Sequence, residues 1–276
     1  MPAIPHFRPP RVSEIDLMNT QYEIRSYIAS GAMGAVYLGH DLVNDCPVAI
    51  KVLPPEMSVN ATFIQRFEQE ASLMSKFQHK NLVKCFHFCS ENKHPYIVME
   101  LVYGRSLEDS MTGEPIEPSV AVDIIIKVTE GVLHAHELGI IHRDIKPANI
   151  LMEQDFNPKL GDFGLSRHIE EEEFGSHILM TPGYSAPEIL HYQELVDERS
   201  DVFALGMILY ELITGRLPVD FYTPPSYYVD VSPLFDFVIA KATNERYNQR
   251  YHDAPSFLAD LKKLQILSHS NSYVAA

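Results

Sequence analysis

The chain has 276 residues, 46% of them hydrophobic and 21% charged, a composition typical of a soluble globular protein. Its 37 acidic side chains outnumber the 22 basic ones, and the formal net charge of −15 disfavours a general nucleic-acid binder, which needs a basic face. The length is large for a single hydrophobic core, so we expect two lobes or domains.

No secretory or membrane segment is expected. The first ten residues are proline-rich without an apolar run, and the longest apolar stretch, residues 202–213, is too short to span a bilayer. Cys46, Cys85 and Cys89 form no complete set of pairs and are expected to be reduced thiols at strand core positions. Cys85 and Cys89 could instead bind a metal, but no second pair completes a site. These features predict a cytoplasmic protein.

The first half of the chain is expected to be rich in strands. Residues 1–20 are predicted to be irregular, and short alternations from residue 22 to residue 99, such as Val48, Ile50 and Val52, predict strands. One helix interrupts them, with Asn60 as its N-cap and an apolar stripe at helical spacing. The stripe consists of Phe63, Phe67, Met74 and Phe77. Glu70 falls in this stripe, and an acid on an inward face requires a cationic partner.

The second half is expected to be mainly helical. Residues 119–138 repeat apolar side chains at Val120, Ile124, Val128 and Val132. Gly139 and Gly215 stand where helices of residues 119–138 and 200–214 should end. Residues 202–213 predict a helix buried on all sides, and residues 256–264 predict a closing helix. The boundary between the two halves lies near residues 102–105.

One segment carries the chemistry, His142-Arg143-Asp144-Ile145-Lys146-Pro147-Ala148-Asn149, and Asp162-Phe163-Gly164 follows it. Two carboxylates, an amide and a lysine have the spacing that phosphoryl transfer from Mg-ATP requires. Asp144 can accept a proton from a hydroxyl, and Asn149 and Asp162 offer oxygen ligands to hard cations. Val48-Ala49-Ile50-Lys51 precedes these blocks, and Ala186-Pro187-Glu188 follows them.

At these residues the chain resembles the eukaryotic-type protein kinase family, from about residue 22 to about residue 264. The resemblance implies the α+β two-lobe protein kinase fold, with a β-rich N-lobe and a helical C-lobe. The implied division is an irregular lead-in (1–20), the N-lobe (21–101), the C-lobe (102–266) and a tail (267–276). Lys146 resembles the Ser/Thr-specific branch, and the short segment 217–231 resembles a compact variant found among bacterial kinases.

The resemblance also assigns a nucleotide site for ATP. Lys51 would contact the α- and β-phosphates and pair with Glu70, although an ordinary solvated strand lysine and an unrelated helix acid are the alternative. Ala29 replaces the usual first glycine of the loop that covers the phosphates. The remaining nucleotide-contacting positions are Ile28, Gly31, Gly34, Val36, Ala49, Met99, Glu100, Val102 and Leu151.

The resemblance implies a role for each residue of the catalytic loop, residues 142–149. Asp144 would orient and deprotonate the acceptor hydroxyl, and Lys146 would neutralise charge on the γ-phosphoryl group. Asn149 and Asp162 would hold Mg²⁺, or Mn²⁺ in its place. Packing or anchoring roles are expected for His142, Phe163, Asp201 and the pair of Glu188 with Arg250.

Glu170 to Glu173 form an acidic run where related segments often carry a phosphorylated Ser or Thr. The run is either a solvated loop or a built-in substitute for phosphate with Arg143 as receiver, and Ser176 is a candidate phosphosite. Two rival functions also stay open: a pseudokinase that binds nucleotide without transfer, and a small-molecule kinase of related fold. The expected partner is a protein with a Ser or Thr acceptor, not nucleic acid.

Overall fold

The computed structural model describes residues 8–15, 17, 20–31, 34–59, 61–90, 94–163, 167–168, 183–191, 193–218 and 222–272. The chain divides into two compact units. The small unit consists of Met1–Gln78 and Val83–Val102, and the large unit consists of His79–Leu82 and Tyr103–Ala276. A β-rich unit and a helical unit agree with the expected α+β fold of two lobes.

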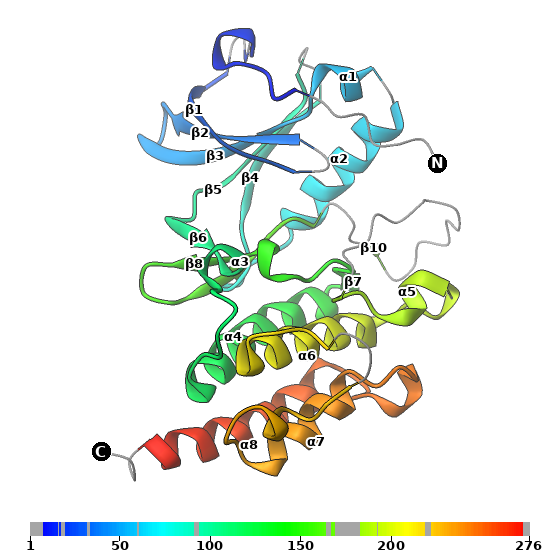
Figure 1. The fold of residues 1–276 in the computed structure, drawn as a ribbon. Coiled ribbons are helices and arrows are strands. Elements are labelled where there is room, and N and C mark those ends of the chain that lie inside the picture. Colours follow the sequence, from blue (N-terminus) through cyan, green and yellow to red (C-terminus); the bar gives the residue numbers. More distant parts are fainter. Residues whose placement is uncertain are drawn as a thin grey trace. The chain divides into compact units, whose positions relative to one another are not determined.

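The small unit is built on one antiparallel sheet with the strand order β1-β2-β3-β5-β4 (Figure 1). Its strands are β1 (Tyr22–Gly31), β2 (Gly34–Asp41), β3 (Cys46–Val52), β4 (Cys85–Cys89) and β5 (Tyr96–Glu100). The helices α1 (Pro55–Ser58) and α2 (Ala61–Met74) lie between β3 and β4. Alternation along β3 places Val48, Ile50 and Val52 in one buried cluster, and α2 packs through Phe67 and Ala71 in another.

The helix α2 differs in extent from its prediction. Asn60, the expected N-cap, lies outside the described residues, and the helix ends at Met74. Phe77, the last member of the expected stripe, is buried but follows the helix. Glu70 is buried within α2, as its place in the apolar stripe requires.

The segment before β1 contributes to the core of the small unit. It contains one 3-10 turn, η1 (Val12–Glu14), and Val12, Ile15 and Leu17 pack against the β3 cluster. The buried Tyr37 hydroxyl donates a hydrogen bond of 2.6 Å to the carbonyl oxygen of Pro10. The described part of this lead-in is therefore mostly irregular but attached to the sheet, a contact that its sequence did not predict.

The large unit is dominated by long helices (Figure 1). These are α4 (Pro118–Glu137), α6 (Glu198–Thr214), α7 (Pro233–Ala242) and α8 (Ala254–Ser272). Helix α4 packs against α6 and α8, and α7 packs against α6. A Cβ on Gly206 would lie 2.7 Å from the Cβ of Ala242, so glycine permits the close approach of α6 and α7.

Short elements complete the large unit. Its strands are β6 (Gly104–Ser106), β7 (Ile140–Ile141), β8 (Ile150–Glu153), β9 (Pro158–Leu160) and β10 (Arg167–His168). They form a β6-β8-β9 sheet and a β7-β10 pair. The short helices and 3-10 turns are α3 (Leu107–Ser110), η2 (Pro147–Asn149), α5 (Pro187–His191), η3 (Gln193–Leu195), η4 (Pro225–Tyr227) and η5 (Tyr247–Gln249).

The predicted helices 119–138 and 200–214 agree with α4 and α6 to within two residues at each end. Gly139 and Gly215 follow α4 and α6 with positive φ angles of 72° and 73°, the left-handed conformation that ends a helix. Helix α6 is buried on almost all sides, whereas α8 extends well beyond the predicted 256–264. Val120, expected in the buried stripe of α4, is 43% exposed. Within the described residues, no helix is long and apolar enough to cross a membrane.

The loop His79–Leu82 connects α2 to β4 but is anchored in the large unit. The Asn81 amide donates to the Pro158 carbonyl oxygen at 2.7 Å, and the Lys159 ammonium group donates to the Lys80 carbonyl oxygen at 2.8 Å. A Cβ on Gly131 in α4 would lie 3.1 Å from the Asn81 carbonyl oxygen. These contacts explain why four residues between two small-unit elements belong to the large unit.

Candidate active site

A buried ion pair joins β3 to α2. The Lys51 ammonium group lies 2.7 Å and 2.9 Å from the two carboxylate oxygens of Glu70. Both side chains are at least nine-tenths buried, and the Phe67 ring centroid lies 6.0 Å from the ammonium nitrogen. Ala49 and Lys51 share a face of β3 because side chains alternate along a strand. The expected cationic partner of Glu70 is therefore Lys51, and the alternative of unrelated charges is wrong.

The β1–β2 hairpin holds the expected glycine-rich loop. Gly31 pairs with Gly34 across the turn, and Ala29 pairs with Val36. A Cβ on Gly34 would lie 2.8 Å from the carbonyl oxygen of Val52, so this position requires glycine. Ile28 is half-exposed at the same end of the hairpin. The two residues at the tip, 32 and 33, lie outside the described residues.

The other expected nucleotide-contacting positions fall in two units. Met99 pairs with Ala49 across β5 and β3, and the Glu100 amide donates to the Lys84 carbonyl oxygen at 2.9 Å. Val102 is the last residue of the small unit. Leu151 lies on β8 of the large unit, where it pairs with Ser106 and Lys159.

The catalytic loop brings three expected residues into direct contact. The Lys146 ammonium group lies 2.7 Å from a carboxylate oxygen of Asp144. The Asn149 amide nitrogen donates to the Asp144 carbonyl oxygen at 2.8 Å and to its carboxylate at 3.3 Å. Asp144 is only 8% exposed, so its carboxylate is fixed by these donors in a largely dry setting.

Asp201 anchors the catalytic loop from the first turn of α6. Its carboxylate accepts the backbone N–H groups of His142 and Arg143, both at 2.9 Å, and a ring nitrogen of His136 lies 2.8 Å away. Arg143 has a φ angle of 69°, a strained conformation for a residue with a side chain, which these bonds hold in place. The anchoring expected of Asp201 is thus confirmed.

The ionisation of Asp201 follows from the same contacts. Complete burial raises the pKa of the carboxyl group, but the hydrogen bond and charge of His136 and the contacts of His142 outweigh burial. The net effect is a pKa below the usual range of an aspartate. Asp201 is therefore a fixed anion beneath the catalytic loop.

The segment that carries Asp162 is tied to the same loop. The Gly161 amide donates to the Asn149 carbonyl oxygen at 2.9 Å, and the His142 ring donates to the Gly161 carbonyl oxygen at 3.1 Å. Phe163 is buried, with its ring centroid 4.5 Å from that of His142. His142 and Phe163 thus have the packing roles expected of them.

The donor atoms at this point fit a divalent cation. Asp162 lies two residues after the end of β9, and it is exposed with a φ angle of 57°. The Asn149 amide nitrogen is engaged with Asp144, so the amide oxygen is the atom left to bind a cation. A carboxylate and an amide oxygen are the hard ligands that Mg²⁺ and Mn²⁺ accept.

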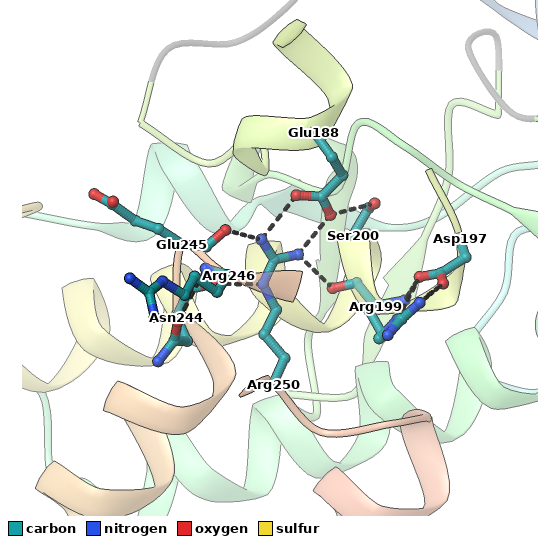
Figure 2. Close-up of polar contacts among 8 residues, drawn as sticks. All are labelled: Glu188, Asp197, Arg199, Ser200, Asn244, Glu245, Arg246 and Arg250. Carbon is teal, nitrogen blue, oxygen red and sulfur yellow. Dashed lines mark hydrogen bonds and ion pairs between the residues drawn. The ribbon is translucent and has the colours of Figure 1, made fainter. Parts of the chain in front are cut away.

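A second buried ion pair connects the Ala186-Pro187-Glu188 segment to Arg250 in the helical part of the large unit. The Arg250 guanidinium group donates to both oxygens of Glu188, at 2.5 Å and 2.7 Å. Figure 2 shows that Ser200 also donates to Glu188 and that Arg250 reaches three backbone carbonyl oxygens around it. The expected Glu188–Arg250 pair is confirmed. Ser200 was not predicted, because a serine in an apolar helix gives no sign of its partner.

Two further expectations lie elsewhere. Glu170 to Glu173 and Ser176 are outside the described residues, so the role of the acidic run stays a prediction. Cys46, Cys85 and Cys89 lie on β3 and β4 and are partly buried. Burial raises the pKa of the Cys85 thiol to about 11, so the protonated form, a poor metal ligand, dominates at neutral pH.

The sequence profile of the protein kinase domain matches residues 22–265. The chain belongs to the protein kinase domain family. It is 35% identical over 269 residues to serine/threonine-protein kinase PknL of Mycobacterium tuberculosis, covering 91% of this chain and 67% of that protein. It is 34% identical over 260 residues to serine/threonine-protein kinase PrkC of Bacillus subtilis, covering 88% of this chain and 40% of PrkC.

A solved structure agrees with this assignment. The kinase domain of Mycobacterium tuberculosis PknI superposes with a TM-score of 0.72 at 26% sequence identity, covering 88% of this chain and 96% of that one. The expected similarity to bacterial kinases of the eukaryotic type is confirmed, and so is the expected enzyme class, serine/threonine-protein kinase.

Proposed function

We propose that this chain transfers the γ-phosphoryl group of ATP to Ser or Thr hydroxyls of proteins through the loop that carries Asp144. The observation that supports this most directly is the contact of Asp144 with Lys146 and Asn149 on a loop anchored by Asp201. A carboxylate, a cation and an amide oxygen within one loop are the groups that phosphoryl transfer requires. The class allows turnover on the order of 1–100 per second.

In the proposed mechanism Asp144 accepts the proton of the acceptor hydroxyl as its oxygen attacks the γ-phosphorus. The bond from the γ-phosphorus to the bridging oxygen breaks, and ADP leaves. Lys146 neutralises charge on the transferred group, and Lys51, held by Glu70, neutralises charge on the α- and β-phosphates. Because these groups are fixed before the reaction, positioning and electrostatics supply most of the acceleration.

Asn149 and Asp162 would hold Mg²⁺, or Mn²⁺ in its place. A bound divalent cation would supply positive charge that neutralises the phosphate groups. The hydrogen bond from Asn149 to Asp144 and that from Gly161 to Asn149 keep the two ligand-bearing segments in register.

The residues that we expect to contact the nucleotide are those of the glycine-rich hairpin together with Ala49, Met99, Glu100, Val102 and Leu151. As lobes of the kinase domain we assign residues 21–101 and 102–266, a division that differs from the compact units at His79–Leu82 and at Val102. The net charge of −15 supports protein partners over nucleic acid. The three partly buried thiols are in keeping with a cytoplasmic location.

The decisive experiment is transfer of radiolabelled phosphate from ATP to a generic basic protein, with identification of the labelled amino acid. Asp144→Asn should abolish transfer yet keep Mg-ATP affinity, because Asp144 acts on the acceptor. Asp162→Asn should also weaken Mg-dependent nucleotide binding, measured by calorimetry. Asp230→Asn, at an exposed position in the large lobe, is the control.

Three results would contradict the proposal. Label on tyrosine would remove the Ser/Thr assignment, and nucleotide binding without transfer would favour a pseudokinase. Equal losses of nucleotide affinity in the Asp144 and Asp162 variants would show that the proposed division of roles is wrong.

A further inference from the structure

The buried imidazole of His136, near the end of α4, lies between two carboxylates of α6. Its Nε2 is 2.8 Å from Asp201 Oδ2, and its Nδ1 is 3.7 Å from Glu198 Oε2. The His136 side chain is 2% exposed and that of Asp201 is 1% exposed, whereas the Glu198 side chain is 30% exposed. Glu198 is thus the solvent-facing end of a line of three groups that leads inward.

The hydrogen-bond directions in this line are fixed by the carboxylate. Asp201 Oδ2 also accepts the backbone N–H of His142, and an ionised carboxylate only accepts, so Nε2 of His136 carries a proton. The other ring nitrogen, Nδ1, is buried and has no hydrogen-bond partner within the part of the chain that the structure describes. Nδ1 instead faces the Glu198 carboxylate, whose Oε2 lies 3.7 Å away.

The helix ends favour the same arrangement. His136 stands in the last turn of α4, where the helix dipole favours a cation. Glu198 and Asp201 stand in the first turn of α6, where the dipole favours anions. The charged groups that face the ring are the carboxylates of Glu198 and Asp201, both from α6.

The inner end of this line supports the reacting loop. Asp201 holds the backbone N–H groups of His142 and Arg143, the two residues before Asp144. We propose that Glu198 is a positioning residue for phosphoryl transfer: it orients His136, which in turn fixes Asp201 and the catalytic loop. We call the line from Glu198 through His136 to Asp201 the relay. The proposal rests on the proposed role of Asp144, but the geometry of the relay can be tested without it.

The test compares Glu198→Gln with the matched control Glu137→Gln, since Glu137 is the exposed neighbour of His136 on α4. Glu198→Gln should lower kcat about three- to five-fold, because a partly exposed ion pair has a modest effect, with the KM for ATP unchanged. Glu198→Asp should recover part of the loss, and Glu137→Gln should behave as the unaltered chain.

Backbone amide NMR provides the reading that is independent of activity. The signals of His142 and Arg143, which donate to Asp201, should shift in Glu198→Gln and stay in place in Glu137→Gln. If the chain transferred no phosphate at all, the proposed function would be wrong. These amide signals would still show whether Glu198 affects the backbone of His142 and Arg143 through the relay. Unmoved signals together with an unchanged kcat would overturn the positioning role of Glu198.

A double-mutant cycle separates the relay from a direct effect of Glu198. His136→Gln keeps one N–H donor for Asp201 but removes the ring that faces Glu198. In this background Glu198→Gln should cause no further loss of kcat, because the path from Glu198 to Asp201 is already interrupted. An equal loss in both backgrounds would show that Glu198 acts by another route. Thermal unfolding of each variant checks that the chain is folded when the rate is measured.

Discussion

Two buried ion pairs in this chain differ in how their cations are surrounded. Arg250 uses all five of its guanidinium donors, two on Glu188 and three on the backbone carbonyl oxygens of Asn244, Arg199 and Glu245 (Figure 2). Lys51 carries a compact ammonium group that meets the two oxygens of Glu70. The planar fork of Arg250 is fixed in one orientation, whereas the ammonium group of Lys51 is a point charge.

This difference indicates that the Arg250–Glu188 pair stabilises the fold, whereas the Lys51–Glu70 pair contributes to phosphoryl transfer. A fully hydrogen-bonded guanidinium group offsets the cost of burying its charge and joins three distant segments of the large lobe. A lysine beside a nucleotide can act on phosphate oxygens while its carboxylate partner keeps it in place. We therefore expect that removal of one partner lowers stability in the Arg250–Glu188 pair and lowers the rate of transfer in the Lys51–Glu70 pair.

The largest expected effect is on stability, in Arg250→Met. This change leaves Glu188 buried without its cation, and such losses cost about 3–5 kcal/mol. The urea midpoint should fall, whereas the kcat of the remaining folded protein should change less than about threefold. Arg246→Met, at an exposed arginine nearby, is the control. A normal midpoint with a large fall in kcat would reverse the roles assigned to the two pairs.

The next effect is on the reaction, in Lys51→Met. Transfer should fall at least about 100-fold because a fixed charge is removed from a dry site, a change of about 2.7 kcal/mol in activation free energy. Circular dichroism should show a folded chain at the assay temperature. Lys76→Met, at an exposed lysine just after α2, should transfer phosphate normally. Unchanged transfer in folded Lys51→Met would place the nucleotide site elsewhere.

The two pairs also differ in how much of them could be predicted from the sequence. Lys51 and Glu70 each stand in a periodic pattern, which predicted a strand face for one and a buried helix face for the other, and the resemblance to the kinase family paired them. The partners of Arg250 beyond Glu188 are backbone carbonyl oxygens, which carry no residue-specific signal. The contact of His136 with Asp201 spans 65 positions and was missed, because periodicity tells which face is buried but not what lies against it. The packing of Val12, Ile15 and Leu17 on the sheet was missed for the same reason.

A smaller effect should appear when both partners of the lysine pair are replaced. Lys51→Met combined with Glu70→Leu removes the unpaired buried carboxylate, and apolar replacements of buried ion pairs are often neutral in stability. The double variant should regain about 1–2 kcal/mol of unfolding free energy relative to Lys51→Met. Its transfer activity should stay as low as in the single variant. Recovery of activity together with stability would mean that Lys51 acts through folding and not through chemistry.

The smallest effect concerns acid stability and Asp201, the anchor shared by His136 and the catalytic loop. Because the pKa of Asp201 is lowered in the folded chain, its contribution to stability is present above the pKa of an unfolded aspartate, about 3.9. That contribution is lost as the pH falls through the lower folded pKa, since protonation then removes the anion that His136, His142 and Arg143 contact. Asp201→Asn should therefore unfold more easily than the unaltered chain at pH 7, and the difference in unfolding free energy should shrink below pH 4. Urea titrations at pH 7, 5, 4 and 3 measure this difference. The control Asp230→Asn should show no such pH dependence. A difference in unfolding free energy that stays constant down to pH 3 would mean that Asp201 acts by shape and packing and not through its charge. Asp201 would then resemble a purely structural group, as the Glu188–Arg250 pair is, and would not be a charged anchor of the catalytic loop.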